Sequence, residues 1–154
     1  MKEIVLSRVD SRLIHGQVIT LCFKHYRFNE ILLVSNKINN DMFLKEMYKL
    51  ILPIGVTIEI VGSQEVEKWW KNNQMKSGKL LILTDTLLNI QLLVKLKIIQ
   101  DKVQIGGLIG GKNKKIYYKS LFLSNIDIEI IQYLKAQNIE LFYQRVPSEK
   151  AIKI

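Results

Sequence analysis

The sequence predicts a single α/β domain, an open, mostly parallel twisted sheet with helices on both faces. Short β-branched or apolar runs alternate with longer segments of helical periodicity, which is the order of the strand–helix units that build parallel sheets. The chain has 154 residues, of which 48% are hydrophobic, and this length suits one sizeable core better than two. No repeat, linker or low-complexity segment interrupts the pattern, so residues 1–154 are expected to form one domain.

The first half of the chain predicts three strands that alternate with three helices. The strands are expected at residues 4–6, 31–35 and 56–61, and the first two helices at 16–25 and 41–52. Pro53 and Gly55 end the second of these helices, because neither residue continues a helix well. Ser63 can cap a third helix, which carries Trp69 and Trp70. Two adjacent tryptophans cannot both face inward, so one is expected to be partly exposed.

The second half continues the alternation. Strands are expected at residues 80–83, 103–105 and 139–143, and helices at 87–97 and 124–137; the continuous apolar run 80–83 is typical of a strand buried on both faces. Ser124 followed by Asp127 has the spacing of a capping box. Four glycines, Gly106, Gly107, Gly110 and Gly111, are expected to form a turn. In such folds ligands bind outside the carboxyl ends of the strands.

The charge of the chain favours acidic partners. The net charge is +9, which suits phosphates, nucleic acid or an anionic protein surface. Most of this charge comes from lysines, which a solvated surface also explains. Only four of the 23 basic residues are arginines, and Arg8 and Arg12 lie within one window of five residues.

Cysteine content and hydropathy predict a cytoplasmic protein. Cys22 is the only cysteine, so no internal disulfide can form, and the first residues lack the apolar core of a signal peptide. The longest apolar stretch, residues 80–100, contains Asp85, Lys95 and Lys97, which are costly at bilayer depth. Any association with a membrane is therefore expected to come through a partner.

Residues that carry chemistry gather between the first strand and the first helix, in the segment 8–18 with the sequence RVDSRLIHGQV. A helix start offers unpaired N–H groups and a positive dipole end, which bind anions. Gly16 lets the backbone approach a bound group closely. Arg8 and Arg12 can hold the oxygens of a phosphoryl group with forked, charge-assisted hydrogen bonds. The segment therefore predicts a phosphate site.

His15 is the candidate nucleophile of this segment. The helix dipole and the two arginines are expected to keep its ring neutral and reactive. Asp10 can either accept a hydrogen bond from the other ring nitrogen or hold an arginine, and the sequence leaves both roles open. One cysteine and two histidines lack the paired spacing of a zinc site, so neither a metal nor a cofactor is expected. The predicted site comprises catalytic His15 and the phosphate-binding residues Arg8, Asp10, Arg12, Gly16 and Gln17.

The segment 8–18 resembles the phosphorylation-site signature of the IIB component of the mannose/fructose/sorbose-type bacterial sugar phosphotransferase system. Supporting similarities span nearly the whole chain and include the glycine pair after a central strand. The sequence differs from the family at Ser11, where a second acidic residue is common, and in the first helix, where the family often has a tryptophan and this chain has residues such as Cys22 and Phe23. The similar elements are Gly106-Gly107, Gly55-Val56, Ile139-Glu140-Leu141 and Arg145-Val146-Pro147.

The resemblance implies a phosphotransferase that works as a relay. In that family a phosphohistidine on the IIA protein would donate to His15, which would pass the group to a sugar held by the membrane IIC and IID proteins during uptake. The protein would then associate peripherally with this permease. Two alternatives remain: a regulatory α/β domain without phosphotransfer, and a basic domain that binds nucleic acid. The second would use the lysines that follow the glycine turn, namely Lys112, Lys114, Lys115 and Lys119.

Overall fold

The sheet has seven strands in the order β3-β2-β4-β1-β5-β8-β9, in a computed structural model that describes residues 1–154. Neighbouring strands are parallel except at one edge, where β9 pairs antiparallel with β8. This arrangement confirms the predicted open, mostly parallel α/β fold. The strands are β1 (Glu3–Asp10), β2 (Glu30–Val34), β3 (Thr57–Val61), β4 (Lys79–Thr84), β5 (Lys102–Gly107), β8 (Glu140–Tyr143) and β9 (Ile152–Lys153).

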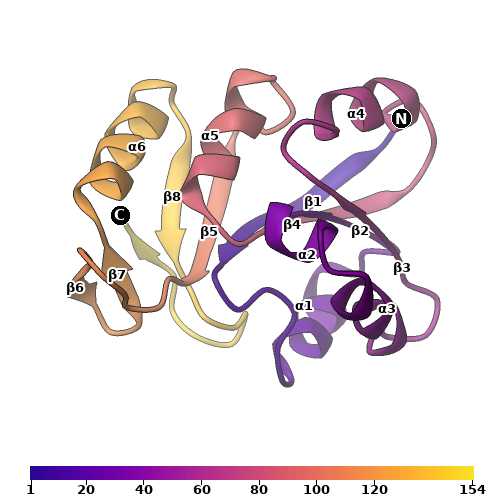
Figure 1. The fold of residues 1–154 in the computed structure, drawn as a ribbon, viewed down its shortest axis with the longest axis horizontal. Helices are drawn as coiled ribbons and strands as arrows, with labels where there is room; N and C mark the ends of the chain where they lie inside the picture. Colours follow the sequence, from indigo (N-terminus) through magenta and orange to yellow (C-terminus); the bar gives the residue numbers. More distant parts are fainter.

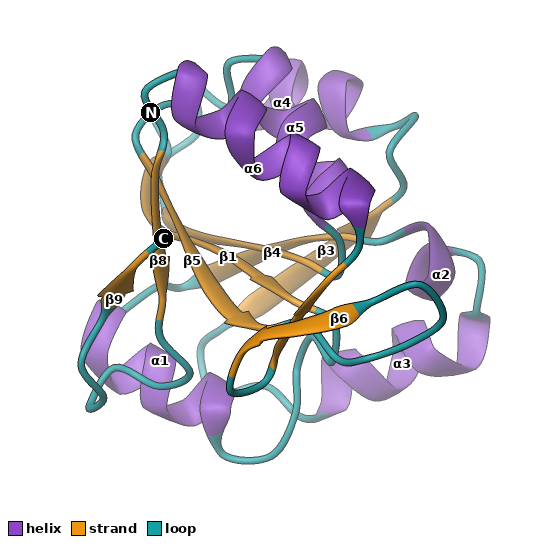
Figure 2. Cartoon of the chain, turned by 90° about the vertical axis from the view of Figure 1, so that its left-hand side faces the viewer, coloured by secondary structure: helices purple, strands orange, loops and turns teal.

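Helices cover both faces of the sheet, as Figures 1 and 2 show. One face carries α1 (Val18–Tyr26), α2 (Asn36–Asn39) and α3 (Met42–Leu50). The other carries α4 (Val66–Asn73), α5 (Leu87–Lys95) and α6 (Asn125–Ala136). None of these helices combines the length and the apolar character that a bilayer crossing requires.

The core divides into two hydrophobic clusters, one on each face of the sheet. Strand β4 contributes to both, because successive side chains of a strand point to opposite faces. Leu80 and Ile82 belong to the cluster under α4, α5 and α6, whereas Leu81 and Leu83 belong to the cluster under α1, α2 and α3. All four are essentially fully buried. The continuous apolar run therefore marks a strand covered on both sides, as predicted.

Strand β1 lies in the middle of the sheet, where the connections change direction. From β1 the chain runs through α1 to β2 on one side, whereas from β4 it runs through α5 to β5 on the other. Such a switch point leaves space between neighbouring loops at the carboxyl edge, where ligands bind in open α/β sheets. The last residue of β1, Asp10, is paired with Gly107 of β5. The segment that follows Asp10 is the one in which the sequence places the phosphate site.

Helix starts are predicted well where a side chain caps them. Ser124 and Asp127 form the predicted capping box of α6, and Asp41 caps α3 by accepting from the backbone N–H of Leu44. The prediction that Ser63 caps α4 is wrong. Ser63 instead exchanges two hydrogen bonds with Asn36, and α4 begins at Val66 with Glu65 at the capping position. Its tryptophans, Trp69 and Trp70, are both half-buried against the core.

Two other expectations need correction around the glycines. Gly106 and Gly107 are the last residues of β5, not part of a turn. The turn contains only Gly110 and Gly111, and it leads into a hairpin of β6 (Lys115–Tyr118) and β7 (Leu121–Leu123) that the sequence did not predict. All four residues of β6 are exposed, so this strand lacks the apolar alternation by which strands are recognised.

Candidate functional site

The loop after β1 is held by two apolar anchors. Leu13 and Ile14 are buried and join the core under α1, while the backbone N–H of Leu13 donates to the carbonyl of Asp10 at 2.9 Å. Leu13 has a φ of 57°, a left-handed conformation that is strained for a residue with a β-carbon. This tight turn leaves His15 at the surface between buried Ile14 and exposed Gly16.

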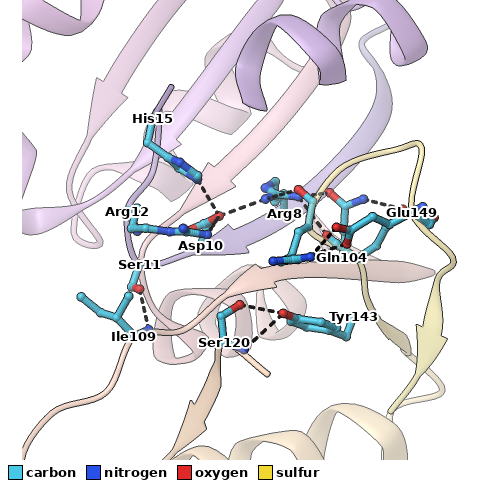
Figure 3. A network of polar contacts seen from close by, with 12 residues as sticks. Arg8, Asp10, Ser11, Arg12, His15, Gln104, Ile109, Ser120, Tyr143 and Glu149 are labelled. Atoms are coloured by element: carbon cyan, nitrogen blue, oxygen red, sulfur yellow. Dashed lines mark hydrogen bonds and ion pairs between the residues drawn. The ribbon is translucent and has the colours of Figure 1, made fainter. Parts of the chain in front are cut away.

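Asp10 is the centre of the site, as Figure 3 shows. Its side chain is fully buried and accepts hydrogen bonds on both oxygens. Oδ1 accepts from the backbone N–H of Arg12 at 3.0 Å and from Arg12 Nε at 3.2 Å. Oδ2 accepts from Arg8 Nη2 at 2.9 Å and lies 3.1 Å from Nε2 of His15. Asp10 therefore fills both roles that the sequence left open.

The charge state of Asp10 follows from these partners. Burial raises the pKa of a carboxyl group, but the charge of Arg8 and the hydrogen bonds and charge of Arg12 outweigh it, so that the pKa of Asp10 is lowered below its ordinary 3.8. The carboxylate is therefore ionised at neutral pH. An ionised carboxylate can only accept hydrogen bonds.

The contact with Asp10 determines the tautomer of His15. Since Asp10 Oδ2 can only accept, the 3.1 Å contact is a hydrogen bond when Nε2 of the ring carries the proton. In the neutral ring Nδ1 then keeps its lone pair. The His15 side chain is 24% exposed, so the ring is held on one side and reachable on the other. This is the arrangement of an oriented nucleophile.

Of the two arginines in the segment 8–18, Arg12 is the one that reaches solvent. Its side chain is 38% exposed and is fixed at its base by Asp10. The end of the guanidinium group lies over Gly107, where a β-carbon would come within 2.8 Å of Arg12 Nη2. The absence of a side chain at Gly107 therefore leaves the space that the Arg12 guanidinium group occupies. An exposed guanidinium group anchored in this way can bind an anion beside His15.

Arg8 lies elsewhere than the sequence suggested. Its side chain is 2% exposed and sits behind Asp10, inside the sheet. Both terminal nitrogens of the guanidinium group are bound to protein acceptors from β1, from β5 and from the chain after β8. This placement does not fit a direct contact with phosphate. Arg8 instead supports Asp10 from behind.

Helix α1 starts two residues later than predicted, at Val18. Gly16, with a φ of 49°, and Gln17 form the turn that precedes it. No side chain caps this helix and no acidic residue lies in its first turn. The first amides of the helix, with exposed Gly16 and Gln17, therefore leave an open, positively polarised end beside His15.

Ser11 ties the loop to the segment after β5. Its hydroxyl group accepts from the backbone N–H of Ile109 at 2.9 Å, and its own backbone N–H donates to the carbonyl of Gly107 at 3.0 Å. At this position, where the resembled family commonly has an acidic residue, the serine fixes the loop without adding charge. The hairpin that carries Lys112, Lys114 and Lys115 follows directly.

Sequence reasoning missed the residues that hold Arg8. Gln104 and Gln144 are buried polar residues on β5 and just after β8, and both contact Arg8. The signal for Gln104 was a lone amide inside the apolar run of β5. His25, the other histidine, lies in α1 with its ring against Tyr26. No group of three or more metal-ligating side chains lies together in the chain.

Comparison with known proteins places the chain in one family. The family "PTS system sorbose subfamily IIB component" matches residues 4–154. The chain is 28% identical over 151 residues to the "PTS system sorbose-specific EIIB component" of Lacticaseibacillus casei, covering 98% of this chain and 92% of that protein. It is 27% identical over 149 residues to the "PTS system mannose-specific EIIAB component" of Escherichia coli K12, covering 97% of this chain. It spans 46% of that protein, about half its length.

Solved structures agree with this assignment. The crystal structure of manxB from Thermoanaerobacter tengcongensis superimposes with a TM-score of 0.89 at 26% identity, covering 99% of this chain and 93% of that one. The IIBSor domain of the sorbose permease from Klebsiella pneumoniae gives a TM-score of 0.92 at 24% identity, with 97% and 92% covered. The second match supports the fold.

Proposed function

The chain belongs to the sorbose-subfamily IIB components of the sugar phosphotransferase system, and from this premise we propose that it is a phosphotransferase whose phosphoryl carrier is His15. The donor is a phosphohistidine of a IIA protein or domain, and the acceptor is a sugar held by the membrane IIC and IID components. We place the protein in the cytoplasm, where it docks on that permease. The observation that carries the proposal is the contact of His15 Nε2 with buried, ionised Asp10.

This contact supports Nδ1 as the attacking atom in the proposed reaction. The lone pair of Nδ1 forms a bond to the phosphorus of the donor phosphohistidine, while the bond from phosphorus to the donor's nitrogen breaks and its electron pair returns to the donor ring. The proton stays on Nε2 of His15. The positive charge that develops on the ring is stabilised by the carboxylate of Asp10 at 3.1 Å.

Two groups are placed to stabilise the phosphoryl oxygens. Arg12 supplies a positive charge at the surface, and the uncapped start of α1 supplies backbone N–H groups around Gly16 and Gln17. Arg8 is left out of this set because its nitrogens are buried and occupied. In the second transfer the sugar hydroxyl oxygen attacks phosphorus, the bond from phosphorus to Nδ1 breaks and its electron pair returns to the His15 ring, and the hydroxyl proton is released to solvent.

The test is transfer of labelled phosphate from a purified phosphorylated IIA protein. Wild-type protein and the His25→Ala variant should take up an acid-labile label, while His15→Ala should take up none. Mass spectrometry of the labelled protein should locate the phosphate on the peptide that contains His15. A label that persists in folded His15→Ala protein would contradict the proposal.

A further inference from the structure

Arg8 carries a positive charge inside the sheet, where a charge is costly unless it finds partners. Both terminal nitrogens of its guanidinium group are paired, whereas Nε is buried without a partner. Nη1 donates to Gln104 Oε1 at 2.5 Å and to the backbone carbonyl of Gln144 at 3.2 Å. Nη2 donates to Asp10 Oδ2 and to the carbonyl of Arg145, both at 2.9 Å. The direction of the Arg8 side chain is thus set by two main-chain carbonyls, one buried carboxylate and one buried amide.

The orientation of that amide is fixed by a chain of hydrogen bonds that begins at the main chain. Gln144 Nε2 donates to the carbonyls of Glu149, at 2.8 Å, and Pro147, at 3.4 Å. A carbonyl can only accept, so Gln144 must present its own Oε1 to Gln104, which donates from Nε2 at 2.8 Å. Gln104 Oε1 is then left to face Arg8, as Figure 3 shows.

This series of hydrogen bonds ends at the Asp10 oxygen that contacts the His15 ring. Asp10 Oδ2, which accepts from Arg8 Nη2, is the same atom that lies 3.1 Å from His15 Nε2. A displacement of the guanidinium group would therefore move or rotate the carboxylate that orients the ring. Gln104 is fully buried and touches neither His15 nor the exposed end of Arg12. Its influence on the ring can act only through Arg8 and Asp10.

We propose that Gln104 is a positioning residue for phosphotransfer: its side-chain oxygen holds Arg8, and thereby Asp10, so that His15 keeps its proton on Nε2 and its lone pair on Nδ1. The effect on transfer rate rests on the proposed function. The effect on the tautomer does not, because it concerns only the resting protein.

Gln104→Met tests the proposal, because methionine has a similar length but offers no comparable acceptor to Arg8. Two quantities are measured: the rate of labelling per folded molecule, and the protonation of the two ring nitrogens of His15 by nitrogen-15 NMR. The rate should fall about ten- to a hundredfold, the usual consequence of a misplaced catalytic group. The NMR signals should show a share of the ring with the proton on Nδ1. Gln100→Met, the same change at an exposed glutamine bound only to the carbonyl of Lys97, should alter neither quantity.

Two further variants separate positioning from simple packing. Gln104→Glu keeps an oxygen facing Arg8 but cannot donate to Gln144 Oε1, so it should restore part of the tautomer lost in Gln104→Met. Gln144→Met leaves Gln104 in place but removes the group that orients it, and it should shift the tautomer in the same direction by a smaller amount. If Gln104→Met does not fold, the His15 tautomer and the labelling rate of these two variants are compared with those of the wild-type protein instead.

The inference is overturned if Gln104→Met, or in its absence Gln144→Met, keeps the wild-type tautomer and rate and loses only thermal stability. Absence of label on wild-type His15 would instead contradict the proposed function. In that case the tautomer measurement still tests Gln104.

Discussion

Gly106 lies against Arg8 so closely that a β-carbon at position 106 would overlap the guanidinium group. The atoms that it would meet belong to Arg8 and to Asp10 Oδ2, both buried and hydrogen-bonded. Neither can move aside without breaking contacts inside the sheet. The first glycine of the pair that ends β5 is therefore required by the arginine of β1.

Gly106→Ala should destabilise the protein by about 1–3 kcal/mol, the usual cost of adding atoms to a filled interior. It should also slow labelling of the molecules that remain folded, because Asp10 is displaced together with Arg8. Denaturant unfolding and labelling rates measure the two effects. Gly111→Ala is the matched control, since a β-carbon there meets no atom within 4 Å. Equal stability of the two variants would contradict the packing described here.

Asp10→Asn should lower stability by about 3–5 kcal/mol at neutral pH, because it leaves the charge of Arg8 buried and uncompensated. The pKa of Asp10 is lowered in the folded protein, so its contribution is complete above the ordinary value of 3.8 and is lost as the pH falls through the lower folded value. Urea unfolding across that range should show the gap between wild type and variant closing in acid.

The control for this experiment is Glu129→Gln, which neutralises an exposed carboxylate of α6. Its stability should stay close to that of wild type at every pH. A gap between wild type and Asp10→Asn that persists unchanged far below 3.8 would contradict an ionised, depressed Asp10.

Arg12→Lys should slow phosphotransfer by about tenfold or more, since one charge-assisted hydrogen bond of roughly 1.5–3 kcal/mol is lost. Lysine keeps the charge but cannot reproduce the fork that both anchors on Asp10 and points outward. Single-turnover labelling measures the rate, and thermal unfolding measures stability. Arg27→Lys, at an exposed arginine after α1, should leave the rate unchanged. A collapse of stability with normal transfer by the folded fraction would assign Arg12 a structural role.

The lysines after the glycine turn should steer an acidic donor toward the loop. Lys112 and Lys115 are exposed, whereas Lys114 is half-buried and lies 3.6 Å from Asp127. Replacing all three with glutamine should lower the association rate with the IIA donor at low ionic strength. The difference should shrink as salt is added, because screening limits their reach to about 10 Å at about 0.1 M. Stopped-flow association at several salt concentrations measures this.

The same change at three exposed lysines, Lys79 and Lys102 at the starts of β4 and β5 and Lys76 shortly before β4, serves as the control for charge alone. It should leave the association rate nearly unchanged. If the triple variant keeps its association rate at every salt concentration but loses affinity for RNA, the lysines belong to a nucleic-acid surface.

The proximity of the polar side chains in the loop could be predicted because these residues are close in sequence. Asp10, Arg12 and His15 are brought together by a single turn, and a cluster of such side chains before a helix is informative by itself. Arg8 is as near in sequence, yet its role could not be predicted. It depends on the register of β1 against β5, which brings Gln104 next to it across 96 positions. The sequence does not display that register.

The β6–β7 hairpin was missed for a different reason. A half-buried strand is recognised by alternating apolar residues, but Lys115–Tyr118 is exposed along its whole length. The hairpin is positioned by long-range contacts, such as the backbone pairing of Leu108 with Leu121. Strands β2, β4, β5 and β8 were located to within two residues, because burial gave them apolar runs. Strand β1, expected at residues 4–6, extends to Asp10, because its polar residues Ser7, Arg8 and Asp10 are buried inside the sheet.

The carbonyl groups that receive Arg8 lie 136 and 137 positions further along the chain. On the ribosome, the first strand is therefore made long before the groups that neutralise its charged side chain exist. Until β8 and the turn after it emerge, closing the centre of the sheet would trap an unsatisfied cation, so earlier chain lengths should remain open or non-native around β1. The arginine that supports the loop after β1 thus makes assembly of the sheet wait until β8 and the turn after it have been synthesised.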